Sequence, residues 1–127
     1  QRRDAMTESE RYEPTLPQLS ARLDELASSR GWGPLHTPQN LLVSMVSEVG
    51  EVAAIFRWDS AGPGHSVAQD VQTKGDLGQE IADVLINLVR LSSVLGLELA
   101  TEVDAKIEEL ESRFPNIEDP RPSLPNE

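Results

Sequence analysis

The spacing of the apolar residues is the feature that most restricts how this 127-residue chain can fold. In residues 15–29, 38–58, 77–96 and 99–114, apolar side chains recur at steps of three and four, which places them on one face of an α-helix. No segment shows the sustained alternation of apolar and polar residues, bounded by turn residues, that is typical of β-strands. The sequence therefore predicts an all-α protein of the four-helix-bundle type.

Residues that favour helix starts lie at the expected places. Thr15 and Gln18 have the spacing of a capping box, in which each side chain bonds to the other residue's backbone N–H. Thr37 followed by Pro38 is a good N-cap and first-turn pair. We expect the third helix to begin after Asp76, and glycine or proline to end the first, third and fourth helices.

The polar flanks and one long connection complete the predicted organisation. Residues 1–14 lack periodicity and are expected to form a flexible N-terminal arm. Four of the nine prolines lie in residues 115–127, which disfavours helix and central strand, so we expect 116–127 to be a Pro-rich C-terminal tail. Residues 15–115 are left as the helical domain. The stretch 59–75 is longer than a typical helix connection and is predicted to be a loop.

The overall charge limits the partners. The chain has 22 acidic and 11 basic residues, a formal charge of −11, which argues against nucleic acid or an anionic membrane as a partner. The absence of cysteine excludes thiol catalysis and zinc–thiolate sites. Because no apolar stretch approaches the roughly 18 residues of a membrane span and no signal-peptide pattern is present, we expect a soluble cytoplasmic protein.

Two acidic pairs interrupt the most apolar helices. Glu48 and Glu51 lie in one predicted helix and Glu80 and Asp83 in another, each pair at i, i+3 and therefore on one helix face. Helices this apolar should pack with these pairs facing each other, and four carboxylates in one pocket would repel. A hard cation removes that conflict, and Mg²⁺ prefers oxygen ligands. The pattern favours a Mg²⁺ site.

A simpler interpretation stays open, because acidic pairs also arise by chance on solvated surfaces. Glu108 and Glu111 have the same spacing, and we interpret them as surface residues. Asn87 and Arg90 continue the polar strip of the third helix. Arg90 is either a phosphate contact or an ion-pair partner of Asp83 or of the neighbours of Asn87. Four helices of this length bury only a small core within one chain. The remaining apolar surface should therefore be buried against another subunit.

Three stretches of sequence resemble a known family. Residues 36–58 (HTPQNLLVSMVSEVGEVAAIFRW), 79–99 (QEIADVLINLVRLSSVLGLEL) and 106–115 (KIEELESRFP) are similar to the all-α nucleoside triphosphate pyrophosphohydrolases, the MazG-like superfamily. The similarity is strongest to its dCTP pyrophosphatase branch. With the first predicted helix, the resemblance covers about residues 16–115.

The resemblance implies a function and a metal site. Members of the family hydrolyse a nucleoside triphosphate to the monophosphate and pyrophosphate, and the substrate implied here is dCTP or a modified pyrimidine deoxynucleotide, in nucleotide-pool sanitation. By position, Glu48, Glu51, Glu80 and Asp83 would be the catalytic residues and the ligands of Mg²⁺, with Mn²⁺ as a substitute. One of the glutamates would also orient or deprotonate the attacking water. The family further implies a homodimer or homotetramer.

The resemblance also suggests substrate contacts. Trp32 and Trp58 match tryptophans of the base pocket, although both would serve equally as packing residues at helix ends. His36 and Asn40 match positions at the start of the second helix, and His36 fits a packing or capping role as well. Lys106 matches a family lysine that could pair with a phosphate, or it is an ordinary surface residue.

Four positions depart from the branch pattern. Leu23, Asn87 and Leu110 stand where the branch has histidine, tyrosine and asparagine respectively, and Phe114 replaces a tyrosine. The first three could touch substrate. The departures leave the acidic quartet intact and bear on the base preference.

Two other classes of protein are alternatives for a helical chain of this kind. A non-catalytic helical bundle that binds a nucleotide or a protein partner would not require the acidic quartet. A carboxylate di-iron protein usually carries E-x-x-H pairs, and neither His36 nor His65 follows a glutamate by three residues. The pyrophosphohydrolase is the preferred hypothesis.

Overall fold

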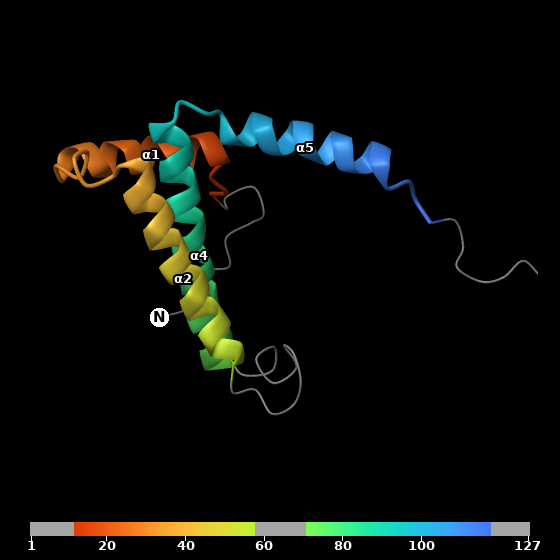
Figure 1. Ribbon diagram of the computed structural model, residues 1–127, viewed down its shortest axis with the longest axis horizontal. Coiled ribbons are helices and arrows are strands. Elements are labelled where there is room, and N and C mark those ends of the chain that lie inside the picture. The colour runs from red at the N-terminus through yellow and green to blue at the C-terminus, as the bar shows by residue number, and fades with distance from the viewer. Residues whose placement is uncertain (1–11, 58–70, 118–127) are drawn as a thin grey trace, which may run out of the picture.

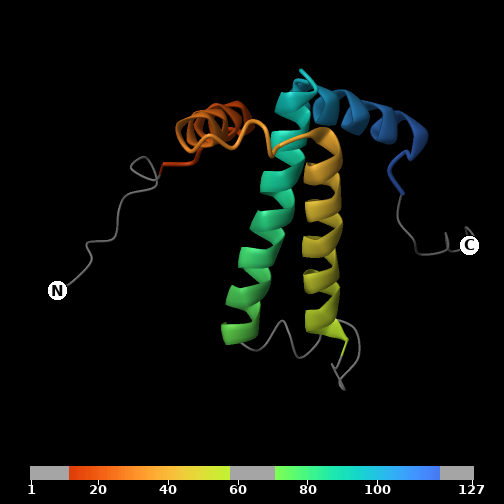
Figure 2. The same cartoon turned by 60° about the vertical axis from the view of Figure 1, so that its left-hand side comes forward.

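Four α-helices account for the regular structure in the part of the chain that the computed structural model describes, residues 12–57 and 71–117. They are α1 (Leu16–Ser29), α2 (Pro38–Phe56), α4 (Val71–Val94) and α5 (Leu99–Arg113). Helices α2 and α4 run antiparallel as a long hairpin, while α1 crosses one end of it and α5 leaves from that same end (Figures 1 and 2). The predicted all-α class is confirmed.

The predicted starts of α1 and α2 are also confirmed. The Thr15 hydroxyl accepts a hydrogen bond from the Gln18 backbone N–H at 3.3 Å, and the Gln18 side chain accepts one from the Thr15 N–H at 2.8 Å. The Thr37 hydroxyl accepts from the Asn40 N–H at 3.2 Å. Both caps satisfy N–H groups that have no partner within the helix, and they fix where each helix begins.

The predicted start of the third helix was wrong. Helix α4 begins at Val71, so Asp76 lies inside it rather than at its N-cap, and the predicted loop 59–75 ends earlier. The predicted loop ended at Gly75, but a glycine inside a helix costs only about 1 kcal/mol, which packing can offset. Thr73 and Leu77 are half-buried, on the same face as later seam residues of α4.

The contact between α2 and α4 follows a regular spacing. On both helices the less exposed residues recur at steps of four and three, as expected for helices that pack side by side at a small crossing angle. We call this contact the seam. Its members are Leu41, Met45, Glu48, Val52 and Ile55 on α2, and Thr73, Leu77, Glu80, Val84, Asn87 and Leu91 on α4. Two glutamates therefore occupy positions at which helix pairs usually carry apolar side chains.

The core within one chain is small. Among the described residues, the buried apolar side chains are Ala27, Leu41 and Val89. By contrast, Val43 and Val46 of α2 are 70% and 63% exposed. The hairpin thus presents apolar surface that the described residues leave uncovered.

Taken singly, the described helices are too short or too polar to cross a membrane. The segments Thr73–Val94 and Leu99–Arg113 satisfy the length and composition test only when joined, and a bend of 106° separates them.

Candidate metal centre

Three carboxylates meet on the seam. Glu48 of α2 and Glu80 and Asp83 of α4 each offer one oxygen, and these oxygens all lie within 4.8 Å of one another. Glu48 and Glu80 are half-buried, whereas Asp83 is exposed. Antiparallel packing places Glu48 opposite Glu80, and Asp83 follows one helical turn later. The structure thus brings together three of the four predicted ligands.

The fourth predicted ligand lies beside this group. Glu51 is exposed, one turn after Glu48, and does not belong to the three-oxygen set. Its carboxylate still acts on Glu80, both through a side-chain hydrogen bond and through its charge. Glu51 therefore lies close enough to act on the site, although it is not one of the three clustered carboxylates.

The pKa of Glu80 reflects the close approach of these carboxylates. A side-chain hydrogen bond with Glu48 contributes most to raising the pKa of Glu80 to about 7, followed by desolvation and then by Glu51. Protonated Glu80 can donate to its neighbours, whereas ionised Glu80 is repelled by them. Among the described residues, its Oε2 atom is buried and has no hydrogen-bond partner.

These observations fit a hard divalent cation. Mg²⁺ and Mn²⁺ prefer oxygen ligands, and a bound cation reverses the local charge that otherwise keeps Glu80 protonated. The buried, unpaired Oε2 of Glu80 supplies an oxygen ready for such a cation. Glu48, Glu80 and Asp83 are the residues that would hold it.

A second group of predicted residues gathers where α1 joins α2. Trp32 is 38% exposed, and its ring centroid lies 5.6 Å from that of His36. His36 is half-buried, and its Nδ1 atom accepts a hydrogen bond from Nε of Arg90 at 3.1 Å. The structure therefore unites three predicted substrate contacts, whose binding roles remain predictions.

Arg90 has an ion-pair partner that the sequence did not indicate. Its Nη1 atom lies 2.5 Å from Oδ1 of Asp24 on α1, rather than beside Asp83. The Ser93 hydroxyl donates to the same oxygen at 2.6 Å. Arg90 is 8% exposed, which makes it a poor phosphate contact. Because 66 residues separate Asp24 from Arg90, only the packing of α1 on α4 reveals the pair.

The remaining predicted contacts are dispersed. The Asn40 amide donates to the Leu35 carbonyl at 3.0 Å, and the Asn87 amide donates to the Asp83 carbonyl at 3.1 Å. Lys106 forms an ion pair with Glu109 at 2.9 Å on α5, which projects away from the hairpin (Figures 1 and 2). Trp58 lies outside the described residues.

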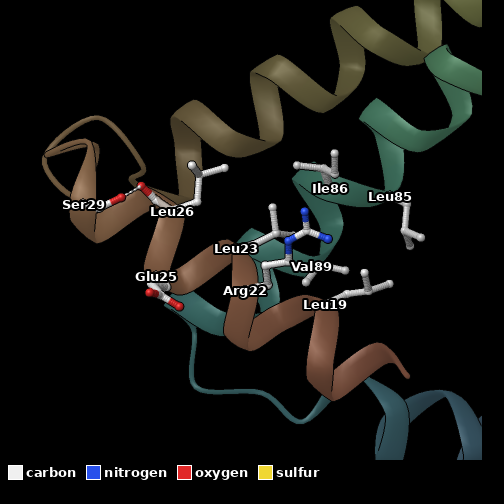
Figure 3. Close-up of a pocket in the computed structure, with 9 residues that line it drawn as sticks. All are labelled: Leu19, Arg22, Leu23, Glu25, Leu26, Ser29, Leu85, Ile86 and Val89. Atoms are coloured by element: carbon white, nitrogen blue, oxygen red, sulfur yellow. Dashed lines mark hydrogen bonds between the residues drawn. The ribbon is translucent and has the colours of Figure 1, made fainter. Parts of the chain in front are cut away.

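A cavity of about 470 Å³ lies between α1 and α4. Apolar side chains from both helices face it, and none of the three clustered carboxylates lines it (Figure 3). Leu23, one of the departures from the branch pattern, belongs to its wall. The full lining is Leu19, Arg22, Leu23, Glu25, Leu26, Ser29, Leu85, Ile86 and Val89.

Known proteins are similar to this chain in sequence and in fold. The chain is 38% identical over 104 residues to dCTP pyrophosphatase 1 of Rattus norvegicus and 35% identical over 103 residues to that of Homo sapiens. These matches cover 81% of this chain but only 61% of each relative, so the chain spans about three fifths of their length. No protein-family model matches the chain.

A solved structure extends the comparison. The crystal structure of a pyrophosphatase from Archaeoglobus fulgidus superposes with a TM-score of 0.70 at 35% sequence identity. The match covers 84% of this chain and 97% of the archaeal one. The likeness therefore includes nearly the whole archaeal fold.

The repulsion between Glu80 and its neighbouring carboxylates predicts that, without metal, the stability of the folded protein depends on pH. Because the pKa of Glu80 is raised from 4.5 to about 7, the folded state binds more protons than the unfolded chain between these values, and stability falls as pH rises through them. The variant Glu80→Gln should therefore melt at a higher temperature than the parent at pH 8 in the presence of a chelator. The difference should shrink toward pH 4.5.

Thermal unfolding followed by circular dichroism measures this effect, with the exposed Glu108→Gln as the matched control. The control should track the parent protein at every pH. Parallel pH profiles for the parent and Glu80→Gln would contradict the assignment of repulsion to this cluster.

Proposed function

The chain belongs to the all-α nucleoside triphosphate pyrophosphohydrolase superfamily, and we propose that it hydrolyses a nucleoside triphosphate to the monophosphate and pyrophosphate in the presence of Mg²⁺. One observation carries the proposal: carboxylate oxygens of Glu48, Glu80 and Asp83 lie within 4.8 Å of one another on the hairpin of this fold. A nucleotide-pool role in the cytoplasm, as expected from the sequence, is part of the same proposal.

The three clustered carboxylates would hold the metal, and the chain's other groups would complete the site. When bound, Mg²⁺ supplies charge neutralisation at the phosphate oxygens and a template for in-line attack. We propose that Glu51, which is exposed beside the cluster, orients the attacking water and accepts its proton. Because phosphoryl transfer depends mainly on positioning and electrostatics, no nucleophilic side chain is needed.

The preferred substrate in this proposal is dCTP or a modified pyrimidine deoxynucleotide. Support comes from the similarity to dCTP pyrophosphatase 1 over 81% of the chain. Trp32, with its partly exposed indole beside His36, offers a surface on which a base could stack. Leu23, one of the departures from the branch pattern, places an apolar side chain in the wall of the α1–α4 cavity.

The proposal includes a homodimer or homotetramer. Besides the seam, α2 carries a second apolar stripe at steps of four and three, formed by Leu42, Val46 and Val49, which are 48%, 63% and 48% exposed. On α4, Ile81 is 53% exposed. Apolar surface of this extent on a helical hairpin is typical of a subunit contact.

The activity is tested by pyrophosphate release from a panel of nucleotides with Mg²⁺ or Mn²⁺. We expect turnover of at least one pyrimidine deoxynucleoside triphosphate. Glu48→Gln and Asp83→Asn should each lower kcat by about 10²–10³-fold, because each removes charge stabilisation at the reacting phosphates. Glu108→Gln should retain the parent activity, since Glu108 is exposed on α5 and belongs to no cluster of described residues.

Two outcomes would overturn the proposal. The first is the absence of pyrophosphate release from every nucleotide tested. In that case, tight binding of a nucleotide would favour the non-catalytic bundle. The second is full activity of Glu48→Gln and Asp83→Asn, which would place the reaction elsewhere in the chain.

The oligomer is tested by introducing a charge into the exposed stripe. Val46→Asp should dissociate the assembly, because a carboxylate in an apolar contact must be desolvated without a partner. Ser44→Asp adds the same charge to the same helix on the face away from the stripe, and should leave the assembly intact. Analytical ultracentrifugation of the three proteins gives the masses. A monomeric parent, or an unchanged mass for Val46→Asp, would contradict this part of the proposal.

A further inference from the structure

The side chain of Arg90 is only 9% exposed, and it joins three parts of the fold. It lies on α4, forms an ion pair with Asp24 of α1, and donates to His36 in the α1–α2 connection. Ser93, one turn further along α4, donates to the same Asp24 oxygen at 2.6 Å. The guanidinium is therefore held at two of its nitrogens and has one fixed orientation.

The contact with His36 determines where the imidazole carries its proton. A guanidinium has only donors, and it stays charged in proteins. Because Nε of Arg90 donates to Nδ1 of His36 at 3.1 Å, Nδ1 has to be an unprotonated acceptor. The single proton of the neutral ring then lies on Nε2.

The surroundings of His36 favour the neutral ring. Partial burial, and then the positive charge of Arg90, lower the pKa of His36. Arg90 is the charged group that faces the ring from α4, and Asp24 is the acid that α1 places behind the guanidinium. At neutral pH, His36 is therefore an uncharged hydrogen-bond donor rather than a cation.

The donor atom lies next to an aromatic surface. The His36 and Trp32 rings are tilted by 41° with centroids 5.6 Å apart, and Trp32 is 38% exposed. Within the described residues, Nε2 of His36 has no hydrogen-bond acceptor, whereas Nδ1 has its donor in Arg90. A flat ring that stacked on Trp32 would bring an acceptor on its edge toward Nε2–H.

The position of Arg90 and His36 relative to the carboxylate cluster agrees with a role in base binding. Arg90 follows Asp83 by seven residues, which corresponds to about 10 Å along the helix axis. This separation is comparable to that between the phosphates and the base of an extended nucleotide. Phosphates at the carboxylate cluster would thus leave the base near the end of the hairpin where His36 lies.

We propose that Arg90 is a positioning residue for base selection, which holds His36 as a neutral Nε2–H donor that favours nucleobases carrying a carbonyl oxygen. The proposal rests on the nucleotide hydrolysis proposed above. Cytosine, uracil, thymine and guanine carry such an oxygen, whereas adenine offers only ring nitrogens as acceptors. A donor fixed to meet that oxygen disfavours a base that has no acceptor at the same place.

The first experiment examines the imidazole directly and needs no turnover. The chain has only two histidines, so the variant His36→Gln assigns the signals of His36 in long-range ¹H–¹⁵N spectra. The parent protein should show the neutral Nε2–H form at pH 7. In Arg90→Gln the His36 pKa should rise and the tautomer preference should weaken, whereas the exposed control Arg113→Gln should match the parent.

The second experiment measures selectivity as the ratio of kcat/KM for dCTP to that for dATP. In Arg90→Gln this ratio should fall about tenfold through KM for dCTP, which corresponds to about 1.4 kcal/mol, with kcat little changed. Arg90→Lys keeps a charge and a donor and should recover part of the ratio. If Arg90→Gln does not fold, Arg90→Lys and Asp24→Asn provide the same comparison, each with a smaller loss.

The results separate the two proposals. Absence of turnover on every nucleotide overturns the proposed hydrolysis, while the spectra still decide the tautomer, and binding of dCMP against dAMP by calorimetry replaces the kinetic ratio. A cationic or Nδ1–H form of His36 in the parent at pH 7 would overturn the inference. An unchanged dCTP-to-dATP preference in Arg90→Gln would overturn it as well.

Discussion

Carboxylate repulsion on the α2–α4 seam is the constraint on which the site depends. A helix pair of this geometry normally buries apolar side chains at seam positions, yet Glu48 and Glu80 occupy two of them and Asp83 lies beside them. In the metal-free protein a proton on Glu80 relieves the repulsion below about pH 7, in keeping with the raised pKa of this residue. A divalent cation would replace that proton and turn an unfavourable contact into a site for phosphates.

The rest of the hairpin holds these groups in place. The cap at Thr37 fixes the start of α2, and the ion pair between Arg90 and Asp24 fixes α1 on α4. The two contacts lie at the same end of the hairpin, where the chain also places Trp32 and His36. One helical pair can therefore carry a charged centre on its seam and an aromatic, hydrogen-bonding surface near its end. These are the two kinds of group that phosphates and a base require.

Local patterns in the sequence predicted most of the helices and the acidic cluster. The capping residues of α1 and α2 act over three residues, so their effect can be read without tertiary information. The start of α4 could not be predicted in this way, because packing of Thr73 and Leu77 against α2 outweighs the weak helix propensity around Gly75. The ion pair of Asp24 with Arg90 was missed because residues 66 positions apart meet only in the folded chain.

Metal binding by the carboxylate cluster is tested most directly by calorimetric titration of Mn²⁺ or Mg²⁺ at pH 7 in two buffers of different ionisation enthalpy. Because the pKa of Glu80 is about 7, the account predicts binding with the release of part of a proton, and loss of that binding in Glu48→Gln. Absence of metal binding by the parent protein, or equal affinity and proton release in Glu48→Gln, would contradict it.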